Sequence, residues 1–101
     1  MPRFSHFLPN IHEGRFIPMG ALQPDHIFRP AELAEELGYD GLWIGEFMES
    51  QADVTAQFAD PPPNYYAPRT LLAMLAARTS RVRLTTGVLV LPYHDPLILA
   101  R

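Results

Sequence analysis

The chain has 101 residues, of which 48% are hydrophobic and 19% are charged, and its formal net charge is −3. These values are typical of one soluble globular domain, or part of one, and they argue against a disordered chain. The charge offers no basic surface for nucleic acid or an anionic membrane. The lack of cysteine excludes disulfides, thiolate metal sites and cysteine nucleophiles.

The opening sequence MPRFSHFLPN has no charged segment followed by a long apolar stretch, so no signal peptide is expected. No apolar run approaches the roughly 20 residues that span a bilayer. The expected location is therefore the cytoplasm.

The first predicted elements are a strand and a helix. The aromatic-rich run RFSHFL, residues 3–8, predicts a short strand that Pro9 and Asn10 bring to an end. A loop rich in glycine and proline continues through Pro24, and Asp25 is the expected cap of a helix.

Apolar residues then recur at helical spacing. Pro30 is expected in the first turn, because deeper in a helix it would remove a backbone hydrogen bond. The predicted apolar stripe consists of Pro30, Leu33, Ala34 and Leu37, and the exposed face carries Glu32, Glu35 and Glu36. Gly38 should end the helix in the left-handed conformation. The run GLWIG is apolar at consecutive positions, which predicts a parallel strand near residues 40–45 that is buried on both faces.

Residues 46–67 show no clear periodicity and contain three consecutive prolines at residues 61–63. This segment is longer than the roughly 2–6 residues of an ordinary connection, and such loops are usually functional or disordered. A second helix follows, with Arg69 and Arg78 outside its apolar stripe, which consists of Pro68, Leu71, Leu72, Leu75 and Ala76.

The run RVRLTTGVLVL predicts a third strand near residues 82–91. Asp95 and Pro96 then indicate a cap and first residue of another helix. The order β-α-β-loop-α-β-α implies a parallel sheet. Three strands and two complete helices would leave open edges and one uncovered face, so we expect the front part of a larger α/β protein.

Three segments carry a resemblance to a known family: AEELGYDGLWIGEF, APRTLLAMLAARTSRVRL and TTGVLVLPYHDPLILAR. Together they resemble the bacterial luciferase-like superfamily, which comprises flavin- or deazaflavin-dependent oxidoreductases built on a (β/α)8 TIM barrel. Such barrels have about 250 residues. The resemblance therefore implies that residues 1–101 form an incomplete, N-terminal segment of a barrel with about three parallel strands. It also implies a small organic substrate and a homodimeric full-length protein.

In that family strand three bulges beneath the isoalloxazine-type ring, commonly with a non-prolyl cis peptide, and the matching positions are Gly87 and Val88. Glycine lets the backbone approach a flat ligand closely. The alternative is a bulge or packing glycine without a cofactor role. The resemblance favours the cofactor role for Gly87. A β-branched residue at position 87 should then weaken cofactor binding while barely changing the fold. The sequence GVLVLPYHDPLILAR looks most similar to members using coenzyme F420, with FMN-dependent monooxygenases next.

Glu46 follows the second strand, at the end where barrel active sites are built. Family members often carry an acidic residue or asparagine followed by a histidine here, and that histidine can serve as acid or base. This chain has Phe47 at the second position, and phenylalanine cannot transfer a proton. The resemblance makes Glu46 the candidate catalytic residue; the alternatives are a residue outside the chain, no base at all, or a solvated carboxylate at Glu46.

The remaining cofactor-binding candidates lie on strands one and three and in the turn after strand three. Thr85 and Thr86 could donate hydrogen bonds to the ring, or could reflect β propensity alone. His6 is expected either to point into the barrel or to be a satisfied core histidine. His94 could face the cofactor pocket or be simply exposed, and Asp95 beside it is more simply a helix cap. Leu42 and Trp43 are interpreted as packing residues.

Other chemistries lack their motifs. The four histidines show no metal-binding spacing, and there is no glycine-rich phosphate motif or nucleophile elbow. Two functions stay open: a flavin-type oxidoreductase that uses F420 or FMN, and a non-catalytic truncated or ligand-binding homologue. Phe47 and the absence of strands four to eight favour the second for the chain taken alone.

Overall fold

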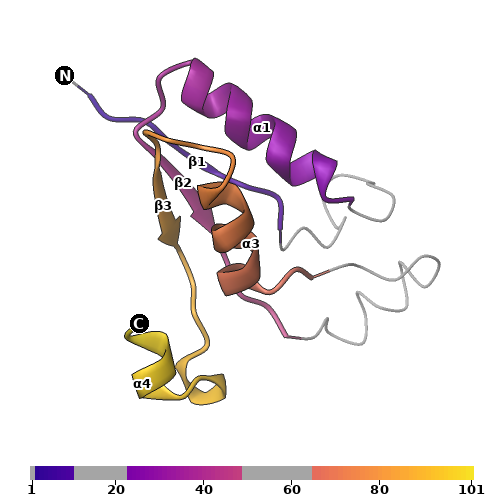
Figure 1. Ribbon diagram of the computed structural model, residues 1–101, viewed down its shortest axis with the longest axis vertical. Coiled ribbons are helices and arrows are strands. Elements are labelled where there is room, and N and C mark those ends of the chain that lie inside the picture. The colour runs from indigo at the N-terminus through magenta and orange to yellow at the C-terminus, as the bar shows by residue number, and fades with distance from the viewer. Residues whose placement is uncertain (1, 11–22, 49–64) are drawn as a thin grey trace.

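Strands and helices alternate along the chain (Figure 1), whose computed structural model describes residues 2–10, 23–48 and 65–101. The elements are β1 (Ser5–Phe7), α1 (Asp25–Glu36), β2 (Gly41–Ile44), α3 (Pro68–Ala76), β3 (Arg83–Thr86), the 3-10 turn η1 (Leu91–Tyr93) and α4 (Pro96–Leu99). Their order confirms the predicted one. The triple proline at residues 61–63 lies outside the described residues.

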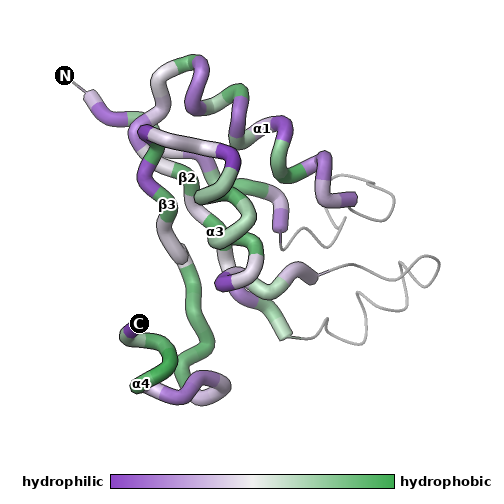
Figure 2. The backbone as a smooth tube through the Cα atoms, viewed as in Figure 1, coloured by the Kyte–Doolittle hydropathy of each residue, from purple (hydrophilic) through white to green (hydrophobic). Residues whose placement is uncertain are grey.

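The three strands form one parallel sheet in the order β1-β2-β3. The three predicted strands are confirmed. β1 and β2 are shorter than predicted by one or two residues at each end, as is common, whereas β3 ends at Thr86, and the apolar run that follows it (Figure 2) lies outside the strand. The arrangement of parallel strands with intervening helices is that of the N-terminal part of a (β/α)8 TIM barrel.

Helices α1 and α3 both pack on one face of the sheet (Figure 1), as right-handed crossovers between neighbouring parallel strands require. The core lies between the helices and the strands. Its buried apolar residues are Leu8, Ile27, Phe28, Ala31, Ala34, Leu42, Ile44, Leu71, Leu75 and Val82. This single layer of contacts fixes the sheet relative to both helices.

The start of α1 differs from the prediction. Asp25 is the first helical residue, and the capping position is Pro24, which has no side-chain cap. Instead, the Gln23 N–H donates to Nδ1 of His26 at 3.1 Å. Pro30 lies inside the helix rather than in its first turn. A proline there lacks the N–H that would bond the carbonyl four residues earlier, and the packing of α1 on the sheet compensates for that loss.

The buried face of α1 is also rotated from the predicted stripe. Ile27, Phe28 and Ala31 enter the core together with Ala34, whereas Leu33 is 45% exposed and Leu37 is 68% exposed. Helix α1 therefore carries two overlapping apolar stripes, and the sheet contacts the one that begins at Ile27. In α3 the buried residues are Pro68, Leu71 and Leu75, with Leu72 packed at the core margin and Ala76 exposed, so most of that stripe is confirmed.

Gly38 ends α1 as predicted, with a φ of +81°. Its N–H donates to the carbonyl of Glu35 at 3.1 Å, and the Tyr39 N–H donates to that of Ala34 at 2.9 Å. This pair of bonds is the Schellman motif, which needs a left-handed residue that glycine adopts without strain. The motif turns the chain directly into β2.

Glu35, expected only on the exposed face, joins α1 to the turn before β3. Its carboxylate accepts hydrogen bonds from the backbone N–H groups of Ser80, Arg81 and Val82 at 2.7–2.9 Å. These bonds favour the ionised form and lower the pKa of Glu35 from 4.5 to about 2.

We expect Glu35→Gln to lower the Tm of the complete protein at neutral pH. A depressed carboxyl pKa contributes stability above pH 4.5, and that contribution is lost as the pH falls towards 2. The variant should therefore lose less stability than the parent between pH 4.5 and 2. Thermal unfolding across this range tests both points, with Glu36→Gln on the exposed side of the same helix as control. Equal Tm values for parent and Glu35→Gln at pH 7 would contradict the expectation.

The face of the sheet opposite the helices, here called the open face, has no covering element among the described residues. The strand register places on it Ser5, Phe7, Gly41, Trp43, Arg83 and Thr85. Trp43 of the second strand is 43% exposed on this face, which agrees with the prediction that three strands and two helices leave one face uncovered. In a (β/α)8 barrel the helices lie outside, so the open face is the barrel interior.

Candidate functional site

The carboxyl end of the sheet carries the predicted site residues, and β3 is irregular there. Ile44 is opposite Thr86, and the Gly87 N–H donates to the Ile44 carbonyl at 2.7 Å, as in a regular parallel ladder. In the next step of a regular parallel ladder, the Glu46 N–H would donate to the carbonyl of Gly87. It donates instead to the carbonyl of Val88 at 3.0 Å. One extra residue therefore lies on the β3 side, and the predicted bulge at Gly87 and Val88 is confirmed.

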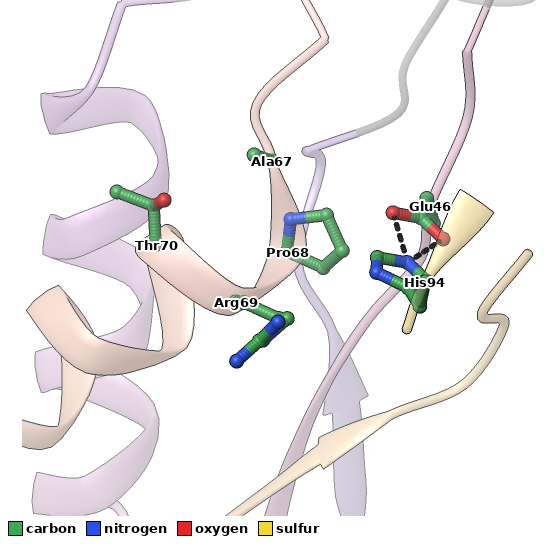
Figure 3. Close-up of a pocket in the computed structure, with 6 residues that line it drawn as sticks. All are labelled: Glu46, Ala67, Pro68, Arg69, Thr70 and His94. Carbon is green, nitrogen blue, oxygen red and sulfur yellow. Dashed lines mark hydrogen bonds and ion pairs between the residues drawn. The ribbon is translucent and has the colours of Figure 1, made fainter. Parts of the chain in front are cut away.

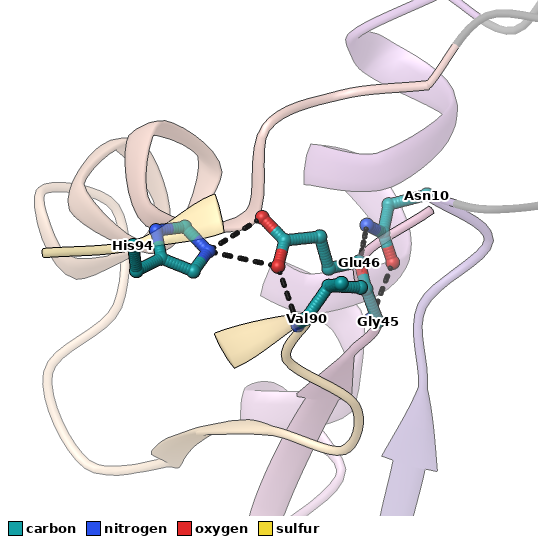
Figure 4. Close-up of polar contacts among 5 residues, drawn as sticks. All are labelled: Asn10, Gly45, Glu46, Val90 and His94. Carbon is teal, nitrogen blue, oxygen red and sulfur yellow. Dashed lines mark hydrogen bonds and ion pairs between the residues drawn. The ribbon is translucent and has the colours of Figure 1, made fainter. Parts of the chain in front are cut away.

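The carboxylate of Glu46 fixes the chain beyond this bulge (Figure 4). Its Oε2 accepts a hydrogen bond from the Val90 N–H at 2.7 Å. Nε2 of His94 lies 2.8 Å from Oε2 and 2.9 Å from Oε1. Glu46 is only 6% exposed, and the His94 side chain is 14% exposed. One buried side chain at the end of β2 thus holds both the strand extension and the following turn.

Opposing effects act on the charge of Glu46. Burial on its own raises the pKa of this carboxyl group, but the hydrogen bonds from His94 and Val90 and the charge interaction with His94 outweigh burial. The net result is a pKa of Glu46 below its usual value. The carboxylate is therefore ionised at neutral pH.

Asn10 reinforces the same strand end from β1 (Figure 4). Its side chain is fully buried; Nδ2 donates to the Gly45 carbonyl at 2.6 Å, and Oδ1 accepts from the Gly45 N–H at 3.0 Å. From the sequence, Asn10 was expected only to end a strand. The available signal was a polar amide immediately after a strand, at the end where barrel sites form.

A cavity of about 480 Å³ opens beside Glu46 (Figure 3). Its lining residues are Glu46, Ala67, Pro68, Arg69, Thr70 and His94. Nη2 of Arg69 donates to the carbonyl of Ile98 at 3.1 Å, which joins the start of α3 to the end of α4. Asp95 caps α4 as predicted, because its Oδ1 accepts from the N–H groups of Leu97 and Ile98.

The other candidates separate onto the two faces of the sheet. Thr85 lies on the open face, in register with Trp43, whereas Thr86 is opposite Ile44 on the helix side. His6 is in register with Leu42 and lines a small cavity with residues of α1, so an orientation into the barrel is wrong for it. Its ring meets Tyr39 edge-on at 6.2 Å.

Gly87 lies next to an aromatic neighbour. A Cβ at this position would be 3.1 Å from Cε3 of Trp43 and 3.6 Å from Cε2 of Phe7. Among the described residues only Gly38 has a positive φ, so Gly87 is required for space rather than for a left-handed backbone. A Cβ at position 87 requires Trp43 to shift by a few tenths of an ångström, and the expectation that a β-branched residue here would barely change the fold stays a prediction.

Phe47 follows Glu46 where the resemblance would place a histidine. It is 37% exposed, and its ring lies 5.3 Å from that of Tyr65. Within the described ranges no group of three or more His, Cys, Asp or Glu side chains could hold a metal ion. No helix in that part of the chain is long and apolar enough to cross a membrane.

Comparison with known proteins gives a consistent assignment. The sequence model of luciferase-like monooxygenases matches residues 2–101. The 4-hydroxyprotoasukamycin monooxygenase of Streptomyces nodosus subsp. asukaensis is 34% identical over 100 residues, which are 96% of this chain and 23% of that protein. The limonene 1,2-monooxygenase of Rhodococcus erythropolis is 32% identical over 69 residues, 68% of this chain and 15% of that protein. The chain thus spans less than a quarter of either relative, and no solved structure matches it significantly.

Proposed function

The chain belongs to the luciferase-like monooxygenase family, and from this membership we propose that it supplies the first three β/α units of a complete barrel that oxidises a small organic molecule with a flavin-type cofactor. The complete protein is this chain within that whole barrel. The cytoplasmic location expected from the sequence and the homodimeric state implied by the family resemblance belong to the same proposal.

The observation that carries the proposal is the bulge at Gly87 and Val88. It lies at the carboxyl end of the sheet, where the active sites of (β/α)8 barrels are built. Bulges are frequent beside active sites because they redirect the backbone. Here three contacts of Glu46 hold the bulged segment, to Val88, Val90 and His94. Such reinforcement suits a surface on which a rigid ring has to rest.

The residues of the open face fit a flat aromatic cofactor. Phe7 and Trp43 present exposed rings beside Gly87, and the bulge adds Val88, which is 52% exposed. Thr85 brings a hydroxyl to the same face. An apolar surface with a few polar groups is typical of cofactor sites. When bound, the cofactor supplies the redox chemistry, and these residues would hold and orient its ring.

The two relatives favour oxygen transfer over simple hydride transfer, since both are monooxygenases by name. Flavins support chemistry with dioxygen as well as hydride transfer. FMN is therefore the first cofactor to test, and coenzyme F420 the second.

Titration of the complete protein with FMN and with coenzyme F420 should show binding of one of the two. We expect oxidised FMN to bind with a shifted absorbance spectrum and altered fluorescence, because its ring leaves water for the open face. Substrate-dependent oxygen consumption with reduced FMN then tests turnover. Binding of F420 alone would move the assignment to hydride transfer. If neither cofactor binds, the chain is better described as part of a non-catalytic homologue.

A further inference from the structure

We propose that His94 exchanges a proton with the molecule bound in the cavity beside Glu46, and that Glu46 is the positioning residue that orients it. This inference rests on the proposed function and names its acid–base group. It reassigns the role expected for Glu46 itself. It also supplies a histidine where Phe47 provides none, from a segment 48 residues further along the chain.

The geometry separates the two nitrogens of His94. Nε2 faces both carboxylate oxygens of Glu46, at 2.8 and 2.9 Å, and Figure 4 shows Nδ1 turned away from that carboxylate. An ionised carboxylate only accepts hydrogen bonds, so Nε2 must carry a hydrogen. Nδ1 is then the atom that gains or loses a proton when the imidazole changes its charge. A carboxylate that orients a histidine in this way is a recurrent arrangement in acid–base catalysis.

Glu46 itself is poorly placed to act as the base. Its Oε2 already accepts from Val90 and meets His94, and its Oε1 also meets His94. Taking up a proton would weaken contacts that hold the bulged segment. The imidazole can change its protonation at Nδ1 while Nε2 keeps its hydrogen bond to Glu46.

The surroundings of His94 suit a titrating group that serves a small molecule. The cavity volume of about 480 Å³ falls within the range of small-molecule sites. Among the residues that the structure describes, the charged groups on the packed elements are Glu46 at the end of β2, Arg69 on α3 and Asp95 at the start of α4. Arg69 is held by the Ile98 carbonyl, and Asp95 caps its helix. Figure 3 shows Arg69 and His94 on neighbouring parts of the same cavity.

The proton balance is simple. An O–H or N–H bond of the bound molecule breaks, an N–H bond forms at Nδ1, and the electron pair stays on the donor atom. The imidazolium charge is balanced by the Glu46 carboxylate, and no atom of His94 changes its oxidation state. In the reverse transfer the N–H bond at Nδ1 breaks, and the proton binds to a lone pair on an oxygen or nitrogen of the bound molecule. Dioxygen is the oxidant of the proposed reaction, and it accepts electrons from the reduced cofactor and from the substrate.

The test uses His94→Gln and Glu46→Gln in the complete protein. The glutamine amide at position 94 can still donate to Glu46, but it cannot exchange a proton. We expect kcat to fall by about 10²-fold or more, as for loss of a general acid or base, with cofactor Kd changed less than about threefold. The pH dependence of kcat that His94 causes should disappear. His26→Gln, at an exposed histidine of α1, is the matched control and should behave as the parent.

Nitrogen NMR shifts of the His94 ring provide a second readout that needs no turnover. The parent should show hydrogen on Nε2 in its neutral form, and Glu46→Gln should lose this preference. Hydrogen on Nδ1 in the parent would overturn the proposal, and so would an unchanged pH profile in His94→Gln. If the parent binds no cofactor and turns over no substrate, the proposed function fails. The NMR shifts still show, independently of turnover, whether Glu46 holds the hydrogen of His94 on Nε2.

Discussion

Replacing Gly87 by valine is expected to weaken cofactor binding to the complete protein by about tenfold or more and to lower its Tm. The new Cβ would lie 3.1 Å from Cε3 of Trp43, so the indole must shift by a few tenths of an ångström, which we expect to lower the Tm without changing the fold. A tenfold change in Kd corresponds to about 1.4 kcal/mol. Thermal unfolding and cofactor titration of the same preparations measure the two effects.

A double substitution distinguishes two reasons for a glycine at position 87: room for the Trp43 indole and room for the cofactor. Gly87→Ala, Trp43→Leu and the combined variant form a cycle in which leucine removes the atom that the Cβ would meet. We expect the combined variant to regain Tm relative to Gly87→Ala. Its cofactor affinity should be lower than that of Trp43→Leu alone, because the added methyl group still occupies the surface on which the ring rests. Equal affinities of the combined variant and Trp43→Leu would show that Gly87 serves only the packing of Trp43.

Replacing Asn10 by leucine is expected to destabilise the complete protein by about 2–6 kcal/mol. Both backbone groups of Gly45 bond to this amide, and each buried group left without a partner costs about 1–3 kcal/mol. Urea unfolding at equilibrium gives the free energy, if the transition is two-state. The matched control is Gln23→Leu, an exposed amide, which should change stability by less than about 0.5 kcal/mol. A loss below about 1 kcal/mol for Asn10→Leu would mean that other groups satisfy Gly45.

Features determined by neighbouring residues were predictable from the sequence. Gly38 was expected to be left-handed because an apolar helix pattern ends there, and Asp95 was expected to cap a helix because Pro96 follows it. Both expectations depend on backbone groups within a few residues. The parallel sheet was predictable because helices separate the strand-forming runs.

The orientation of side chains was less predictable. Alternation along a strand shows which residues share a face, but it does not show which face meets the helices. His6 and Thr86 consequently turned out on the helix side, while Thr85 lies on the open face. In α1 two overlapping stripes had similar apolar character, and only contact with the sheet selects the one containing Ile27 over the one containing Leu33.

Hydrogen bonds between residues far apart in the sequence could not be predicted at all. Glu46 and His94 were both singled out, but their contact joins residues 48 positions apart. Asn10 and Gly45 are separated by 35 positions, and Glu35 and Val82 by 47. Each contact depends on strand order and register, which one sequence does not specify. The candidate site was therefore recognisable as a set of residues before the structure showed which of them act together.

The open face has a consequence for the order in which a complete barrel is made. In the proposed barrel these three units would leave the ribosome before any strand that could cover Phe7 and Trp43, because synthesis proceeds from the N-terminus and domains fold as they emerge. Both rings are nearly half exposed on the sheet, and Val88 beside them is exposed as well. Nascent chains of this length should therefore attract chaperones. For the same reason, the 101 residues expressed alone should self-associate at concentrations where the complete protein stays dispersed.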